Sequence, residues 1–181
     1  MIRRSGGGRT RPDVVAAASF ALAGISVASF GALAAERMIT VGAAETVRIY
    51  PGGAQFTARI DTGALTSSIN AQKIKRFSRG GRRWVRFELV GKQGQTVAME
   101  RPIVRTVRIK RFGQDSERRT VVRIGICMGG FYKDAQVTLQ DRRRRAYPVL
   151  IGRRYMAGAV IVDPGREYLV PPECSGRRTA K

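Results

Sequence analysis

One aspartate stands where the sequence could present a catalytic carboxylate. Asp61 ends the strand-like run 56–60 and is followed at once by Thr62, Gly63 and Ala64. Glycine lacks a Cβ, so such a turn lets another molecule approach the backbone closely, and the small Ala64 suits the wall of a cleft. An Asp-Thr-Gly sequence is also typical of an ordinary β-turn, because Asp and Gly are common turn residues. The apolar strand before it favours a chemical role for Asp61.

A second segment, much later in the chain, strengthens this interpretation. Leu150 and Ile151 form an apolar pair that is followed by Gly152 and Arg153. We expect this segment to pack behind the aspartate turn. Gly152 and Arg153 would support the turn, and Arg153 could also pair with an acidic group.

Peptide hydrolysis by aspartates needs two carboxyl groups that share one proton. The ionised group activates water as a general base, and the protonated group donates a hydrogen bond to the scissile carbonyl. Because only one Asp-Thr-Gly is present, we expect a homodimer whose two-fold axis brings two copies of Asp61 together, with highest activity in mild acid. Thr62 would lock the two loops by a hydrogen bond, and Thr66 and Ser67 would satisfy backbone groups of the turn.

Asp163 is the other aspartate that ends an apolar strand, at residues 160–162. It could in principle act as an intrachain partner of Asp61. However, Asp163 is followed by Pro164 and Gly165, and Asp-Pro-Gly is a strong turn former. The sequence therefore favours a structural turn at this position over a second catalytic carboxylate.

The composition excludes several other catalytic mechanisms. The chain has no histidine, and triads with a Ser or Cys nucleophile need an imidazole base. Cys127 and Cys174 are its only cysteines, and zinc rarely binds to carboxylates alone. The Gly-rich loop that binds nucleoside triphosphates is missing from the sequence. We therefore expect no metal site and no cofactor, so hydrolysis would rest on carboxylate chemistry.

The N-terminus has the pattern of a targeting segment. Residues 1–12 carry four arginines and no acidic residue, and residues 14–34 are uncharged and mostly apolar. The segment ends in Ala32-Leu33-Ala34, which is typical of signal-peptide cleavage. We expect a signal peptide over residues 1–34 and a periplasmic or secreted protein. The alternative is an uncleaved signal anchor that attaches the protein to a membrane, since the run approaches the ~20 residues of a bilayer span.

The formal net charge of +21 favours acidic partners. For an exported protein, an acidic peptide or an anionic envelope polymer is a better candidate than a nucleic acid, so we expect no nucleic-acid partner. A solvated basic surface without any specific partner explains the same charge. Export would also place Cys127 and Cys174 in an oxidising compartment, where they would either form a disulfide or stay unpaired.

Period-two alternation dominates the chain and predicts an all-β domain. Residues 84–89 are a clear example, with one apolar and one polar face. We expect a closed or partly open barrel of short antiparallel strands, with one short helical turn at residues 152–157.

The boundaries expected from this pattern are as follows. Residues 35–44 form a lead-in, residues 45–170 the barrel domain and residues 171–181 a basic C-terminal tail. Within the domain, residues 76–83 are expected as a loop or hairpin tip, residues 112–117 as a loop, and residues 167–170 as a candidate edge strand.

These motifs resemble a known family. Residues 58–69, with Asp61-Thr62-Gly63-Ala64 among them, are similar to the Asp-Thr-Gly block of retropepsin-like domains labelled "ATP-dependent zinc proteases". Such domains are often encoded beside RimK-type glutamate ligases. Residues 84–87, 141–153 and 162–164 resemble further blocks of the family. The resemblance covers roughly residues 41–169 and implies a retropepsin-like acid-protease barrel with Asp61 as the catalytic aspartate.

The resemblance has further implications for function. Some members of that family are associated with trimming glutamate tails, and an arginine-lined cleft would suit such a substrate. The zinc and ATP in the label find no ligands or motif in this sequence. The chain departs from the family at Leu65, where a basic residue is common, and in its export signal.

Two functions follow from these observations. The first is an exported, homodimeric aspartic peptidase that uses Asp61. The second is a non-catalytic module that keeps the barrel and binds acidic peptide or an anionic envelope polymer. The intact Asp-Thr-Gly-Ala favours the enzyme, because a binding module does not need a carboxylate in that turn.

Overall fold

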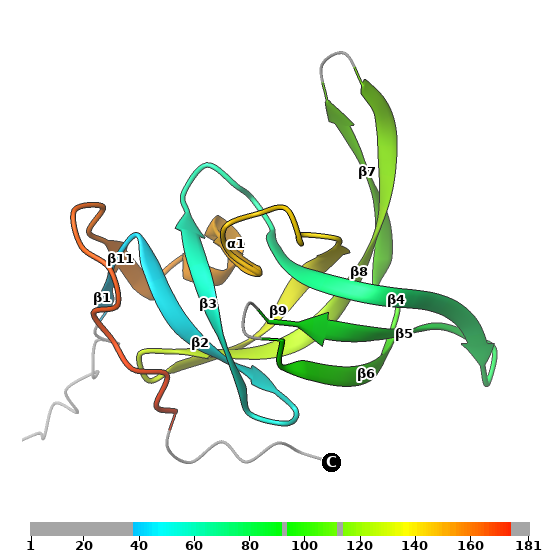
Figure 1. Ribbon diagram of the computed structural model, residues 1–181, viewed down its shortest axis with the longest axis horizontal. Helices are drawn as coiled ribbons and strands as arrows, with labels where there is room; N and C mark the ends of the chain where they lie inside the picture. The colour runs from blue at the N-terminus through cyan, green and yellow to red at the C-terminus, as the bar shows by residue number, and fades with distance from the viewer. Residues whose placement is uncertain (1–37, 92–93, 112–113, 175–181) are drawn as a thin grey trace, which may run out of the picture. The chain divides into compact units, whose positions relative to one another are not determined.

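The alternation seen in the sequence becomes an almost entirely β-structure in the computed structural model of the chain (Figure 1). The structure describes residues 38–91, 94–111 and 114–174. The expected signal peptide or anchor at residues 1–34 lies outside these ranges, as does most of the expected C-terminal tail. Within them, no helix is long and apolar enough to cross a bilayer.

Eleven strands and one short helix make up the described chain. They are β1 (Ile39–Val41), β2 (Ala44–Tyr50), β3 (Ala54–Asp61), β4 (Ser67–Arg79), β5 (Arg82–Val90), β6 (Thr96–Pro102), β7 (Arg105–Arg111), β8 (Gln114–Met128), β9 (Phe131–Gln140), β10 (Val149–Gly152), α1 (Arg153–Met156) and β11 (Val160–Val162).

Six of these strands close into a barrel in the order β10, β3, β2, β8, β9, β4. β10 closes the ring because it pairs with β3 on one side and with β4 on the other. The all-β barrel with one short helix is therefore confirmed. Its strands are mixed rather than all antiparallel, since β10 runs parallel to β3 and β4 runs parallel to β9. A parallel pair needs a crossover, and the long chain between β3 and β10 supplies one.

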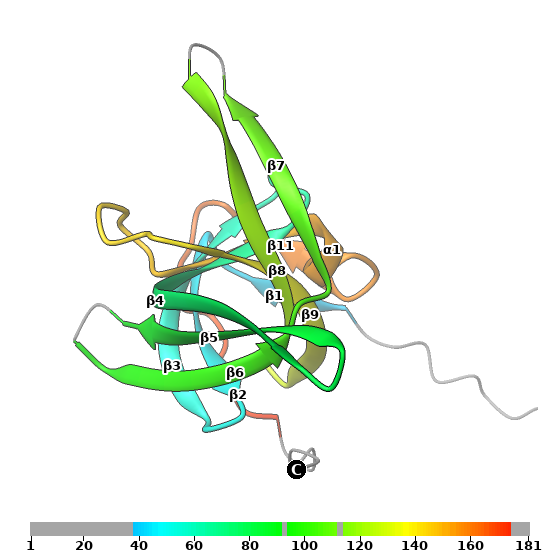
Figure 2. The ribbon, with the colours of Figure 1, turned by 90° about the vertical axis from the view of Figure 1, so that its right-hand side faces the viewer.

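A three-stranded extension and a two-stranded arm extend beyond the barrel (Figures 1 and 2). The outer part of β4 pairs with β5, which pairs with β6. β7 pairs with β8 to form a two-stranded arm that projects from the barrel. The expected loop or hairpin tip at residues 76–83 is reduced to a turn at Gly80 and Gly81, both with positive φ. Phe77 stacks on Trp84 across this hairpin, so the polar stretch around it holds strand geometry.

Three further expectations need correction. Residues 112–117 are not all loop, because β8 begins at Gln114. The lead-in at residues 35–44 contributes a strand, β1, which pairs in parallel with β11. Residues 167–170 do not form an edge strand. Instead, the backbone N–H groups of Leu169 and Val170 donate to the carboxylate of Glu45. This side chain takes the hydrogen bonds that a neighbouring strand would otherwise accept.

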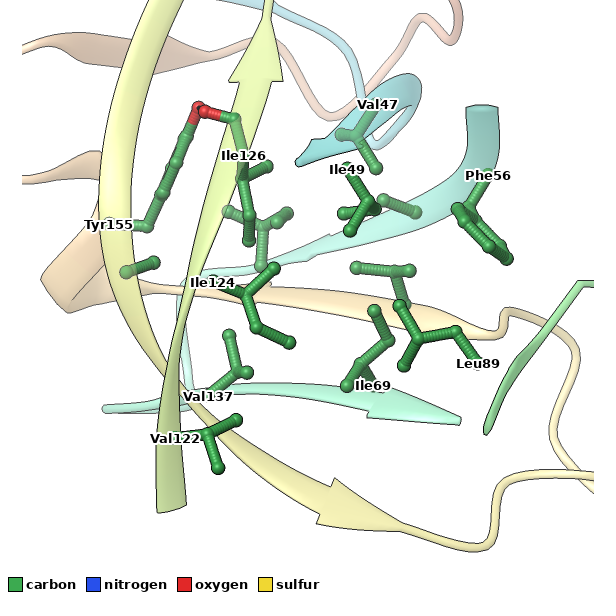
Figure 3. Close-up of a cluster of buried hydrophobic side chains, with 14 of the residues drawn as sticks. Val47, Ile49, Phe56, Ile69, Leu89, Val122, Ile124, Ile126, Val137 and Tyr155 are labelled. Carbon is green, nitrogen blue, oxygen red and sulfur yellow. Dashed lines mark hydrogen bonds between the residues drawn. The ribbon is translucent and has the colours of Figure 1, made fainter. Parts of the chain in front are cut away.

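The barrel interior is filled by branched aliphatic side chains that alternate with outward-facing residues along each strand (Figure 3). Ile124 of β8 lies near Val137 of β9 in this core, and Ile126 of β8 lies further along the strand, toward Tyr155. Tyr155 of α1 closes one end, and its hydroxyl donates to the backbone carbonyl of Ile126. The helix that follows β10 is thereby attached to the core, which fixes the position of β10.

A buried carboxylate and a disulfide help to attach the C-terminal segment to the barrel. Glu45 is completely buried on β2, and it accepts hydrogen bonds from the backbone N–H groups of Gly42, Leu169 and Val170. Cys174 then forms a disulfide with Cys127, which is buried on β8. The two cysteines therefore serve the fold, because they fasten the last described residues to a barrel strand.

Removing this disulfide should destabilise the domain without unfolding it. The bond joins residues 47 positions apart, so its loss should lower the free energy of unfolding by about 2–4 kcal/mol. Urea denaturation with and without reductant measures this for the wild type and for the double variant Cys127→Ala/Cys174→Ala. The reductant should not change the denaturation midpoint of the double variant. A wild-type midpoint that reductant leaves unchanged would contradict the assignment.

Candidate functional site

Asp61 stands at the last position of β3 with its carboxylate turned back over the following loop. Its Oδ1 accepts hydrogen bonds from the backbone N–H groups of Gly63 and Ala64, each at 3.0 Å. The N–H of Ala64 also approaches the Asp61 carbonyl oxygen at 3.3 Å. One carboxylate oxygen is thus fixed by the turn, and no hydrogen bond within the described chain engages Oδ2. The turn therefore fixes Oδ1 and leaves Oδ2 available to a reactant.

The sequence explains why this turn is possible. The alternation of β3 carries the chain to Asp61, and Gly63 leaves the space beside it open. A Cβ at Gly63 would lie 3.2 Å from the Asp61 Oδ1, closer than ordinary side-chain contacts. Thr62 and Gly63 are exposed, and so is Leu65, with 50% of its surface accessible. The loop is therefore accessible from solvent and is not packed under its own barrel.

β10 supports the turn from behind, as the sequence predicts. In the parallel register between β10 and β3, Gly152 lies opposite Asp61. A Cβ at Gly152 would lie 2.8 Å from the Thr66 carbonyl carbon, 2.9 Å from the Ala64 oxygen and 3.0 Å from the Ser67 nitrogen. Since all three are backbone atoms, they could not move aside without moving the loop. Only glycine allows β10 to approach this closely.

Hydrogen bonds complete the contact between the two segments. The N–H of Gly152 donates to the Ser67 hydroxyl at 3.1 Å, and the N–H of Arg153 donates to the Ala64 carbonyl at 2.8 Å. The Arg153 guanidinium donates to the carbonyls of Thr62 and Gly63, at 2.8 and 3.0 Å. Arg153 therefore supports the loop through its backbone carbonyls, whereas the sequence had also allowed an acidic partner.

Arg142 is a site residue that the sequence analysis did not single out. It is buried, and its guanidinium donates to the Ser68 hydroxyl at 2.9 Å and to the Tyr147 carbonyl at 3.1 Å. Its backbone N–H donates to the Asn70 Oδ1 at 2.8 Å. Arg142 thus fastens the loop after β9 to the start of β4, next to the Asp61 turn. The sequence signal for Arg142 was its position in residues 141–153, one of the blocks that resemble the family.

The electrostatic surroundings of Arg142 are mostly positive. Burial lowers the pKa of its guanidinium from the usual value, and the charges of Arg145 and Arg119 lower it further. The charge of Asp61 acts in the opposite direction, so the two groups lie within electrostatic reach of each other. Arginine stays protonated despite such shifts. A permanent positive charge therefore stands near the carboxylate of Asp61.

A groove of about 580 Å³ opens beside the loop. Leu65 and Thr66 form one wall, and Val107 and Ile109 of the projecting β7–β8 arm form another. None of the described residues that line it is acidic, whereas five are arginines: Arg105, Arg119, Arg142, Arg145 and Arg154. Asp61 lies beside this groove and does not line it. The groove can therefore hold an anionic chain next to the aspartate.

Arg119 shows that this groove has an unused donor. Only 8% of the residue is exposed, and one terminal nitrogen pairs with the Glu117 carboxylate at 2.6 Å. Its Nε is buried and has no hydrogen-bond partner in the described part of the chain. An unsatisfied buried donor is costly, so an acceptor supplied by a ligand would be favourable at this point.

The structure gathers most of the predicted site residues at one place. Asp61, Thr62, Gly63, Ala64, Thr66 and Ser67 form the turn, and Gly152 and Arg153 contact it. Leu150 lines the groove and Ile151 is buried in the core.

Asp163 has a different role from Asp61. Its carboxylate accepts from the Gly165 N–H and from Arg166, at 2.9 and 2.7 Å. The bond from Arg166 holds the pKa of Asp163 below its usual value. These contacts belong to a structural turn. In the described ranges no cluster of three or more Cys, Asp or Glu side chains could hold a metal ion.

Comparison with known proteins agrees with this geometry. The profile of the RimB-like family, described as "Retropepsin-like aspartic endopeptidase RimB", matches residues 40–173. Two relatives named "Probable alpha-L-glutamate ligase", from Shewanella pealeana and Desulfotalea psychrophila, are 37% and 36% identical over 113 and 109 residues. These matches cover 61% and 59% of the chain but only 25% and 24% of the relatives, so the chain corresponds to about a quarter of their length.

A solved structure shares the fold. The Legionella pneumophila protein Lpg0085, whose function is unknown, superposes with a TM-score of 0.64 and 27% sequence identity. The match covers 72% of this chain and 96% of that one.

Gly152→Ala tests the close approach of β10 to the loop. The added methyl group would collide with backbone atoms of residues 64–67, so the free energy of unfolding should fall by about 1–3 kcal/mol. Chemical denaturation measures the loss. Gly165→Ala is the matched control, because its Cβ would lie 3.4 Å from the Asp163 Oδ1 and should cost far less. Equal losses in the two variants would contradict the assigned contact.

Proposed function

Because the chain belongs to the RimB-like family of retropepsin-like aspartic endopeptidases, we propose that it is an exported peptidase that works as a homodimer. One observation carries the proposal. The Asp61 carboxylate is held through one oxygen by the Gly63 and Ala64 N–H groups, on an exposed loop that β10 supports. This arrangement fixes an acid where another molecule can reach it, and a purely structural turn has no need for it.

The chemistry requires a second carboxylate close to the first. Within this chain, Asp163 is engaged in its own turn by Arg166 and Gly165, so a second copy of Asp61 is the better partner. Two exposed loops related by a two-fold axis would bring the carboxyl groups together. One ionised Asp61 would take a proton from the attacking water, and the protonated Asp61 would donate to the scissile carbonyl. Thr62, next to each aspartate, would form a hydrogen bond across that axis.

We propose an acidic peptide or protein segment as the substrate. The groove beside the loop carries five arginines, and none of its described lining residues is acidic. The charge thus favours glutamate- or aspartate-rich chains. The buried Nε of Arg119 adds a donor for which the described residues supply no acceptor.

The sequence supplies few groups that could bind zinc or ATP, the two cofactors in the label of the family that it resembles. The sequence has no histidine and no phosphate-binding loop, and both cysteines are in the disulfide. A hydrolytic mechanism through Asp61 needs neither zinc nor ATP. We propose export from the arginine-rich start and apolar run of residues 1–34, either with cleavage or with the segment kept as a membrane anchor.

A non-catalytic binding module is the second candidate. One observation favours it, since the arginine-lined groove does not include Asp61 itself and would hold an acidic chain or an anionic envelope polymer without cleaving it. Activity separates the two functions. A binder retains acidic ligands and cleaves nothing, whereas a peptidase generates new N-termini from them.

Asp61→Asn tests the proposed chemistry. The amide cannot serve as the base, so peptide cleavage should fall by at least about three orders of magnitude. Mass spectrometry of a glutamate-rich peptide library, run in mild acid, measures it. A pepstatin-type inhibitor should suppress the wild type and a metal chelator should not. Asp163→Asn is the matched control and should keep most of the activity. Equal cleavage by the wild type and Asp61→Asn would exclude this mechanism.

Arg145→Gln tests the preference for acidic substrates. Arg145 lines the groove, has no ion-pair partner in the described chain and is exposed. Its loss should raise KM for a glutamate-rich peptide about threefold to fivefold and leave KM for a neutral peptide nearly unchanged. Arg144→Gln, on the same loop but outside the groove lining, is the control. If both variants change KM equally, net charge rather than the groove sets the preference.

A further inference from the structure

The positive groove beside Asp61 continues along the barrel surface. A second hollow, of about 450 Å³, is lined by Arg123, Lys133 and Asp134 among others. Arg105 and Arg154 line both this hollow and the first groove. The two spaces therefore adjoin across these two side chains, and a ligand lying in the first could extend into the second.

The strand register explains how these side chains come to lie in one row. Side chains at every second position of a strand share a face, so Arg119 and Arg123 of β8 point to the same side. Arg105 of β7 is paired with Val121, which lies between them. Two residues of a strand span about 7 Å, so Arg119 and Arg123 are roughly 13 Å apart along β8, with Arg105 beside the midpoint.

The lining of the second hollow carries more positive than negative charge. Arg105 donates to the Gln136 Oε1 at 3.2 Å, and Lys133 donates to the carbonyls of Arg154 and Tyr155 at 2.8 and 3.2 Å. In the described ranges, none of Arg105, Arg123, Lys133 and Arg154 forms a salt bridge. Asp134 is the one acidic residue in the lining, and its carboxylate accepts from the Tyr132 hydroxyl at 3.2 Å. Positive charge is therefore in excess here.

The spacing and the lining favour a peptide over a nucleic acid. In an extended peptide, alternate side chains point the same way at intervals of about 7 Å, which matches the row Arg119, Arg105 and Arg123. Single-stranded nucleic acids bind through aromatic side chains on which bases stack. The aromatic residue of this lining is Tyr155, which is 1% exposed and cannot offer its ring to a base.

We propose that Arg123 and Lys133 form a second anion-binding subsite, which holds the acidic segment of a substrate away from the scissile bond. The subsite rests on the proposed function, because it extends the groove beside Asp61. A chain of acidic residues would lie extended from the Asp61 loop, past Arg105 and Arg154, to Arg123. Affinity should therefore increase with the length of the acidic segment and stop increasing once the chain reaches Arg123.

Binding by the uncleaving Asp61→Asn protein tests this subsite separately from catalysis. Fluorescence anisotropy would compare glutamate peptides of about four and about ten residues, the longer one able to span some 33 Å when extended. The long peptide should bind about tenfold more tightly than the short one at low salt. In the Asp61→Asn background, Arg123→Gln should weaken long-peptide binding about threefold to fivefold, and Arg123→Glu should weaken it more.

Arg118 provides the matched control. It is exposed on the same strand, has no salt bridge in the described part of the chain, and points to the opposite face from Arg123. Arg118→Gln and Arg118→Glu carry the same charge changes and should leave the length dependence intact. Circular dichroism confirms that each variant is folded.

Three outcomes would overturn the subsite. They are equal affinity for the short and long peptides, equal weakening by the Arg118 and Arg123 variants, and displacement of the peptide by single-stranded DNA that binds more tightly through Arg123. None of these bears on the proposed peptidase, which is judged by cleavage with the wild-type protein. Conversely, a protein that cleaves nothing but binds long acidic peptides through Arg123 would keep the subsite and lose the proposed reaction.

Discussion

The contact between Gly152 and the backbone of residues 64–67 is the constraint on which the site depends. β10 lies between β3 and β4 and closes the barrel there, so the strand that completes the fold also supports the Asp61 turn. A side chain at Gly152 would meet backbone atoms at 3.0 Å or less. The same close approach therefore contributes both to the stability of the barrel and to the position of the loop that carries the carboxylate.

This support is built from several parts of the chain. Tyr155 attaches α1 to the core behind β10, and Arg153 at the start of α1 holds the carbonyls of Thr62 and Gly63. Arg142 attaches the next loop to Ser68. The result is an exposed turn, held by several hydrogen bonds, that carries one carboxylate beside a groove rich in arginine. In the proposed function, a second copy of the chain supplies the other carboxylate, and an acidic substrate complements the charge of the groove.

The parts of the site that could be predicted from the sequence are those set by short motifs. Asp61 to Ala64 and Leu150 to Arg153 are each contiguous in the sequence, and glycine at fixed positions indicates where backbones meet. The role of Arg142 and the residues of the arginine groove could not be assigned, because they come together only where β7, β8 and the loop after β9 meet, and composition gives only a net charge. Residues 76–83 were expected as a loop or hairpin tip because they are polar; they form a hairpin tip at Gly80 and Gly81, with Phe77 stacked on Trp84 across the paired strands.

Subunit mixing is the most direct test of the central claim, that catalysis needs one Asp61 from each of two chains. Wild-type and Asp61→Asn chains would be combined in known ratios, allowed to exchange and assayed at constant total protein. If both aspartates are required, activity follows the square of the wild-type fraction, so an equal mixture retains about a quarter of the activity. Activity that falls in direct proportion to the wild-type fraction would show that each chain works alone, and would contradict the account.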